Sequence, residues 1–212
     1  MARQPADSAA HAGPTSRRRL SAMPGERHPP RRVVVVTGPE SCGKSTLAHD
    51  LAADRGGIWV AEVARDYLTG APSTGYTPQD LLHIAQRQYA AETCAHPADG
   101  LTILDTDALV LELWWRERFG APPPTFLDLL DRWLAQRPRY YLLCQPDLPW
   151  ERDPLREHSA ERERLYDWHE RRLQGLADAA AMPAQALYGV VSGRGPARLD
   201  CARGLLAAWE RG

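Results

Sequence analysis

The 212-residue chain contains no asparagine and only one lysine, two phenylalanines and three isoleucines, whereas alanine, arginine, proline and glycine are abundant. Such a bias is typical of a genome rich in G and C, so the arginines alone do not indicate nucleic-acid binding. Residues 1–32 carry seven arginines and two acids (net +5), which leaves 19 basic and 25 acidic residues (net −6) for the rest. A mildly acidic body argues against a nucleic-acid partner, because nucleic-acid-binding domains are usually basic.

Long apolar runs and clustered cysteines are also missing. No stretch approaches the ~20 apolar residues that cross a bilayer, and the N-terminus lacks the apolar segment of a secretory signal. The four cysteines form no CxxC pair and no zinc-ligand spacing. These absences predict a reduced, cytoplasmic protein with no membrane partner. The length predicts one globular domain.

Residues 1–31 are mostly alanine, proline, arginine, serine and glycine, with almost no large apolar side chain. Such a segment buries too little surface to offset the entropy lost on ordering. We therefore expect a disordered tail over residues 1–31 and a folded domain over residues 32–212. Met1 and Met23 both remain candidate starts of the natural protein.

From residue 33 onward, short apolar β-branched runs alternate with patterns of helical period. The alternation predicts βαβ units with right-handed crossovers, hence a three-layer α/β fold of about five parallel strands. The expected strands are residues 33–36, 58–62, 101–104, 140–144 and 187–191. The expected helices are 45–55, 78–94, 108–119, 125–136, one from the charged segment 151–163 to about 181, and 197–210.

Residues 38–45 read Gly-Pro-Glu-Ser-Cys-Gly-Lys-Ser and match the P-loop pattern G-x-x-x-x-G-K-[ST], with a strand before the loop and a helix after it. In such a loop the backbone N–H groups and the helix N-terminus surround phosphate oxygens. The lysine reaches the β- and γ-phosphates and the serine hydroxyl binds Mg²⁺. The motif therefore predicts a P-loop NTPase of the nucleoside- or nucleotide-kinase type, with ATP and Mg²⁺ as cofactors. The predicted nucleotide-binding residues are Gly38, Glu40, Ser41, Cys42, Gly43, Lys44, Ser45 and Thr46.

Lys44 is the only lysine in a chain whose other basic side chains, histidine apart, are all arginine. A compact ammonium fits between phosphate groups where the broad guanidinium does not. The exception therefore supports a catalytic role for Lys44.

Acidic residues follow the second and third predicted strands, where ligands of open α/β sheets bind. We expect Asp105 to bind the magnesium, with Asp107 near the substrate; the alternative for Asp107 is a helix N-cap. Glu62 is the candidate general base, with Arg65 and Asp66 beside it at the substrate; the alternative is a surface ion pair between Glu62 and Arg65. Which of the three acids Glu62, Asp66 and Asp105 accepts the proton stays open.

Two further segments complete the predicted site. Gln86 would hydrogen-bond an acceptor from its helix, unless it lies on the solvated face. Residues 149–156 form a charged lid, whose Arg156, together with Arg162 beyond it, would stabilise charge on the transferring phosphoryl group. The alternative for Arg162 is a solvated helix start. Tryptophans within helical patterns, Trp114 among them, are interpreted as core packing.

Together these motifs resemble the ribosylnicotinamide kinase domain at the C-terminus of the bacterial NAD-biosynthesis regulator, and its stand-alone relatives among AAA-type P-loop ATP-binding domains. The match runs from residue 33 to near residue 208. It is carried by Glu40-Ser41 within the loop, Glu62-x-x-Arg65-Asp66-Tyr67, Ile84-Ala85-x-x-Gln88, Asp105-Thr106-Asp107 and Pro146-Asp147-x-Pro149-Trp150-x-x-Asp153-x-x-Arg156.

The resemblance implies ATP-dependent phosphorylation of the ribose 5′-hydroxyl of nicotinamide riboside, giving nicotinamide mononucleotide in NAD salvage. Three positions depart from the family: Cys42 replaces the common serine, Val63 replaces an aromatic residue, and Pro154 replaces glycine. Trp150 is the candidate to stack on the nicotinamide ring in place of that aromatic. The alternatives are a kinase for another nucleoside, or a regulatory P-loop ATPase without a small-molecule acceptor. The sequence leaves the oligomeric state open.

Overall fold

The computed structural model describes residues 32–69, 75–95, 100–151 and 160–211. Five strands form one parallel sheet in the order β2-β3-β1-β4-β5. The strands are β1 (Arg32–Thr37), β2 (Ile58–Val60), β3 (Leu101–Asp105), β4 (Arg139–Cys144) and β5 (Tyr188–Val191). The helices are α1 (Lys44–Arg55), α2 (Val63–Leu68), α3 (Pro78–Cys94), α4 (Ala108–Phe119), α5 (Pro124–Leu134), α6 (Arg162–Ala179), α7 (Ala184–Leu187) and α8 (Pro196–Trp209). The expected α/β fold is confirmed.

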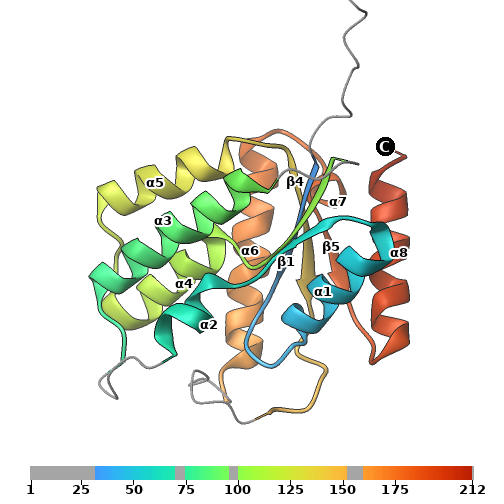
Figure 1. Ribbon diagram of the computed structural model, residues 1–212, viewed down its shortest axis with the longest axis horizontal. Coiled ribbons are helices and arrows are strands. Elements are labelled where there is room, and N and C mark those ends of the chain that lie inside the picture. The colour runs from blue at the N-terminus through green and yellow to red at the C-terminus, as the bar shows by residue number, and fades with distance from the viewer. Residues whose placement is uncertain (1–31, 70–74, 96–99, 152–159, 212) are drawn as a thin grey trace, which may run out of the picture.

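Helices cover both faces of the sheet (Figure 1). Alternate residues of β1 point to opposite faces, as a strand requires. Val34 and Val36 pack with α1 and α8, whereas Val33 and Val35 pack with residues of α3, α4 and α6. A third apolar cluster joins α2, α3, α4 and α5 beside the sheet. The run of four valines is therefore buried on both sides, which explains its unbroken apolar character.

The expected elements are present with small changes at their ends. The second strand ends at Val60, so that Glu62 lies in extended backbone and forms the N-cap of the unexpected short helix α2. The short helix α7 was also not expected. In the described stretches, no helix combines the length and the apolar character that crossing a membrane requires.

The strand order places β1 in the centre, between β3 and β4. The chain leaves β1 for β2 on one side and later reaches β4 on the other, and ligands of open α/β sheets bind beside such a switch point. Val36 pairs with Asp105 in the ladder, and the amide of Thr106 donates to the oxygen of Val36 at 3.1 Å. The loop after β1 and the acid that ends β3 are therefore neighbours.

Candidate active site

The loop between β1 and α1 has the backbone of a phosphate cradle. Gly38, Ser41 and Gly43 all have positive φ angles, of 133°, 53° and 77°. A Cβ atom on Gly38 would lie 2.7 Å from the carbonyl oxygen of Cys144, and one on Gly43 would lie 2.8 Å from a methyl carbon of Leu148. Gly38 is therefore required by sterics as well as by conformation, because it meets backbone, whereas Gly43 is required mainly by its positive φ angle.

Lys44 begins α1 and donates to the carbonyl oxygen of Pro39 at 2.7 Å. Burial alone would lower the pKa of Lys44, but the neighbouring Cys42, Glu62 and Asp105 outweigh this effect and raise it. The lysine therefore remains a cation, surrounded by groups that carry or can acquire negative charge.

Asp105 is 1% exposed at the end of β3, and it accepts a hydrogen bond from the Ser45 hydroxyl. Burial raises the pKa of Asp105, while this hydrogen bond and the cations of Lys44 and Arg65 act in the opposite direction. Within the described residues its Oδ1 atom has no hydrogen-bond partner.

A buried carboxylate oxygen without a partner, next to a serine hydroxyl, fits a magnesium ion. Mg²⁺ is commonly held by one or two protein oxygens together with substrate phosphates and waters. Within the stretches that the structure describes, no group of three or more His, Cys, Asp or Glu side chains could hold a metal ion. Ser45 and Asp105 are thus the residues that would hold the ion.

Glu62 is half-buried on the same side and forms an ion pair with Arg65 at 3.2 Å. Burial raises the pKa of Glu62, and the nearby Asp105 raises it further, against the effects of Lys44 and Arg65. The backbone around Glu62 is fixed by Gln88, which accepts from the amide of Val63 at 2.7 Å and donates to the oxygen of Ala61 at 3.1 Å.

Two hollows meet at the loop. The larger, of about 290 Å³, is bounded by the loop, the start of α1, Leu148, Pro149, Glu151 and the start of α8. The smaller, of about 60 Å³, is bounded by residues 38–41, Glu62 and the apolar side chains of Val110, Leu113, Trp114 and Leu165. Ser41, Lys44 and Arg65 line both. Every predicted nucleotide-binding residue therefore borders one hollow or the other.

Asp105 reaches the site through the Ser45 hydroxyl and itself lines neither hollow, and four further expected residues lie elsewhere. Asp107 is completely buried: it caps α4 through the amide of Leu109 and binds Arg139 at 3.1 Å and Tyr141 at 2.9 Å, so its carboxylate is not open to a substrate. Asp66, on α2, and Gln86, on α3, are exposed and line neither hollow; on α3 it is Gln88 that occupies the buried side. Trp150 also lines neither.

The lid is described only in part. Arg162 donates to the carbonyl oxygens of Leu148, at 2.9 Å, and of Ser41, at 3.0 Å, and so connects α6 to the phosphate loop. The backbone amide of Glu151 also donates to the hydroxyl oxygen of Ser41 at 3.3 Å. Arg156, the other lid arginine expected at the site, lies outside the described residues.

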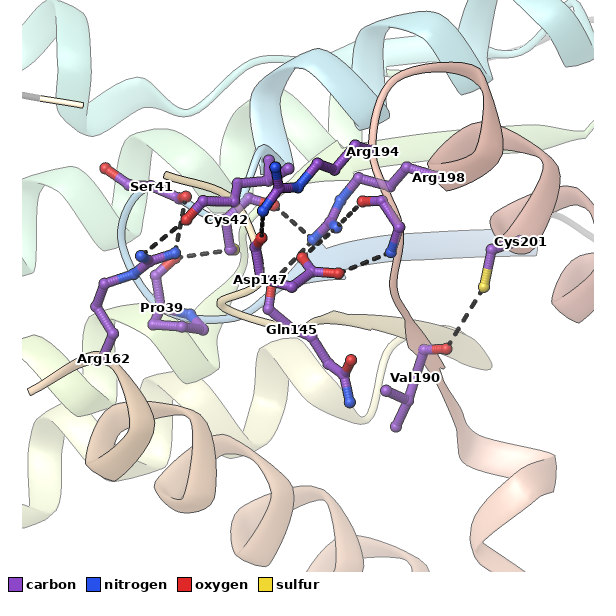
Figure 2. A network of polar contacts seen from close by, with 12 residues as sticks. Pro39, Ser41, Cys42, Gln145, Asp147, Arg162, Val190, Arg194, Arg198 and Cys201 are labelled. Carbon is purple, nitrogen blue, oxygen red and sulfur yellow. Dashed lines mark hydrogen bonds and ion pairs between the residues drawn. The ribbon is translucent and has the colours of Figure 1, made fainter. Parts of the chain in front are cut away.

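Arg198, near the start of α8, is a site residue that the sequence did not indicate (Figure 2). The residue is 4% exposed, and its guanidinium donates to the carbonyl oxygens of Cys42 at 2.7 Å, Gln145 at 3.0 Å and Gly193 at 2.7 Å. It also binds the carboxylate of Asp147 at 2.6 Å. One side chain thus joins the phosphate loop, the segment after β4 and the segment after β5.

Cys42 lies within this network of cations. Burial raises its pKa, but a hydrogen bond with Cys144 and the charges of Lys44, Arg198 and Arg162 outweigh burial and lower the pKa of Cys42 to about 6. The loop thus carries a thiol that ionises more readily than an ordinary one.

The chain was compared with known proteins. Among solved structures it is similar to a NadR protein in complex with NR, with a TM-score of 0.68 and 21% identity, covering 85% of this chain. It is also similar to a NadR protein in complex with NAD and AMP-PNP, with a TM-score of 0.62 and 23% identity, covering 84% of this chain. The chain spans about half of those proteins, 50% and 49% of their lengths. No curated protein matches it.

These likenesses agree with the resemblance expected from the motifs and, at such identity, establish the fold. A family model described as an AAA domain matches residues 33–180, which is more than half of the chain. The chain therefore belongs to this AAA domain family.

Proposed function

We propose that the protein is a magnesium- and ATP-dependent kinase that phosphorylates the 5′-hydroxyl of nicotinamide riboside. The observation that carries the proposal is the pair of hollows that meet at Ser41, Lys44 and Arg65. A phosphate donor in one and an acceptor in the other would meet at the lysine, and holding two reactants in line is a large part of what phosphoryl transfer requires.

The larger hollow suits the nucleotide. It is lined by Ser41 to Thr46, and the backbone amides of these residues, with the N-terminus of α1, are complementary to phosphate oxygens. Magnesium at Ser45 and Asp105 would neutralise charge on the β- and γ-phosphates when bound. Lys44 would exchange its hydrogen bond to Pro39 for a phosphate oxygen.

The smaller hollow suits the hydroxyl that receives the phosphate. Glu62 lines it, and the raised pKa of this glutamate makes it a stronger base than an ordinary surface carboxylate. Glu62 would accept the hydroxyl proton, while Arg65 holds its other side through the ion pair. Arg162 would bind the transferring group once it exchanges the carbonyl oxygens of Leu148 and Ser41 for phosphate oxygens. We expect Arg156 to bind the same group.

Nicotinamide riboside is favoured over other nucleosides because its ring is cationic. Trp114 offers an aromatic surface in the smaller hollow, and Glu62 and Asp105 supply negative charge nearby. Trp150 remains a second candidate for stacking on the ring. A similar NadR protein has been solved with NR, the abbreviation of nicotinamide riboside, which supports the same acceptor here.

The decisive experiment measures ADP release from Mg–ATP with a panel of nucleosides, with the product identified by mass spectrometry. Nicotinamide riboside should give the highest kcat/KM. A clear preference for uridine, cytidine or thymidine would contradict the acceptor but leave the kinase intact. ATP hydrolysis that no nucleoside stimulates would support the alternative, a regulatory P-loop ATPase.

A further inference from the structure

Two buried thiols meet beneath the phosphate loop. Cys42 belongs to the loop, Cys144 is the last residue of β4, and both are completely buried in the apolar cluster between the sheet and α1. The two side chains are hydrogen-bonded to each other. Both residues also approach Gly38: a Cβ atom there would lie 3.2 Å from the sulfur of Cys42 and 2.7 Å from the carbonyl oxygen of Cys144.

The two cysteines differ in reactivity. Cys42 lies near the cations of Lys44, Arg198 and Arg162, which favour its thiolate. The pKa of Cys144 is raised well above its usual value, first by the hydrogen bond with Cys42 and then by burial, so this residue keeps its proton. A thiolate in contact with a thiol is the arrangement in which one cysteine is oxidised and the other resolves it.

We propose that Cys42 and Cys144 are a modification site, at which a hydroperoxide converts the two thiols into an intramolecular disulfide that closes the phosphate loop to ATP. In the first step the Cys42 thiolate attacks a peroxide oxygen, the O–O bond breaks, and Cys42 becomes a sulfenic acid. In the second step the Cys144 sulfur attacks the Cys42 sulfur, and the hydroxyl leaves as water. With hydrogen peroxide, two thiols and one peroxide give one disulfide and two waters.

The disulfide changes the loop because Cys42 takes part in its internal bonding. Its thiol donates to the carbonyl oxygen of Pro39 at 2.9 Å, and the same oxygen accepts the Lys44 ammonium. Oxidation brings the two sulfurs to a bond length of about 2.05 Å, which pulls the loop toward β4. The amides that face the phosphates move with it, and we expect ATP affinity to fall at least ~10-fold.

The test uses the full chain, first reduced and then treated with a small excess of hydrogen peroxide. Intact mass should fall by the mass of two hydrogens, peptide mapping should join Cys42 to Cys144, and calorimetric titration should show the loss of ATP binding. Dithiothreitol should restore binding, and saturating Mg–ATP should slow cross-linking. None of these readouts requires kinase activity, so they remain valid if the proposed acceptor is wrong.

Two variants provide matched controls. The double variant Cys94→Ser/Cys201→Ser retains the pair and should be inactivated reversibly like the parent. Cys144→Ser should bind ATP normally while reduced and should form no disulfide with Cys42; a large excess of peroxide should instead convert Cys42 to sulfinic and sulfonic acids, which dithiothreitol does not restore. If Cys144→Ser folds poorly, Cys144→Ala serves the same purpose. The proposal is overturned if a small excess of peroxide leaves the mass of the parent protein unchanged, if mapping joins other cysteines, or if the cross-linked protein binds ATP with unchanged affinity.

Discussion

The ammonium nitrogen of Lys44 lies 2.7 Å from the carbonyl oxygen of Pro39, so the only lysine of the chain folds back onto its own loop. A bound phosphate would compete with this carbonyl oxygen for the ammonium group. The bond keeps the loop formed in the absence of phosphate, because it holds the start of α1 against the start of the loop.

Lys44→Arg should lower kcat/KM for ATP at least ~10²-fold, because the guanidinium fork does not fit between phosphates as the ammonium does. Nucleotide titration and ADP release measure the effect. Arg211→Lys makes the opposite exchange at an exposed site near the C-terminus and should have no effect. Equal activity in the Lys44→Arg protein would show that the lysine does not touch the transferred phosphate.

Glu62→Gln should reduce turnover at least ~10²-fold while leaving ATP affinity nearly intact, as expected when a general base is removed. Asp105→Asn should instead raise the magnesium concentration that half-maximal activity requires. Asp66→Asn is the matched control, because Asp66 is exposed and outside both hollows. An active Glu62→Gln together with an inactive Asp66→Asn would assign the base to Asp66.

Alkylation of Cys42 should abolish ATP binding, and saturating Mg–ATP should protect the thiol. The pKa of Cys42 is lowered to about 6, so its thiolate fraction rises through pH 6 and is nearly complete by pH 7. The rate of labelling by iodoacetamide should therefore level off near neutral pH, whereas an ordinary thiol, of pKa about 8.5, continues to accelerate. Mass-spectrometric labelling profiles test this; a Cys42 rate still rising steeply above pH 8 would contradict it.

Arg198→Ala should lower the free energy of unfolding by about 2–4 kcal/mol, because it leaves three carbonyl oxygens and a carboxylate without a shared donor. ATP affinity should fall as well, since one of those carbonyls belongs to Cys42. The control is Arg194→Ala, which removes an exposed arginine that, among the described residues, donates to the carbonyl oxygen of Asp147. Similar losses in both variants, by denaturant unfolding and calorimetry, would mean that Arg198 has no special role.

His169 makes stability depend on pH. It is completely buried on α6, with its Nδ1 atom 3.4 Å from the Thr37 hydroxyl, and burial together with the charge of Lys44 lowers its pKa to about 3. The unfolded chain binds a proton below about pH 6.5 and the folded chain does not, so stability falls as pH decreases from 6.5 toward 3. The expected loss from this residue is about 2 kcal/mol by pH 5.

Denaturant unfolding at pH 7 and pH 5 measures this loss. His169→Gln should have a smaller pH dependence, whereas His49→Gln, at an exposed site, should behave like the parent. An unchanged slope in the His169→Gln protein would rule out His169 as its source.

The strands and the phosphate loop were predictable because their signals are local. Four consecutive valines, followed at once by a glycine-rich turn, identify β1 and the cradle without any knowledge of the rest of the chain. Gln88 entered the sequence analysis only as part of the Ile84-Ala85-x-x-Gln88 motif, and its role in holding the backbone around Glu62 became visible only in the structure.

The remaining features depend on contacts between distant residues. Arg198 binds the oxygen of Cys42 across 156 positions of the sequence, and no local pattern marks it among many arginines. Asp107 was assigned to the substrate because it follows a strand, but Arg139 and Tyr141 arrive from β4 and enclose it. Trp114 packs against the apolar cluster of α2 to α5, as expected, but it also lines the smaller hollow, because helix periodicity does not show where a neighbouring loop leaves space.

The meeting of two hollows at one lysine has a consequence for inhibition. A single compound with adenosine at one end, the acceptor nucleoside at the other and a polyphosphate between them would occupy both sides at once. Its second half would bind at the high effective concentration that a tether provides, so its affinity should far exceed that of either half. Because the advantage disappears when the tether is too short, a series of compounds with increasing numbers of phosphates would act as a molecular ruler between donor and acceptor.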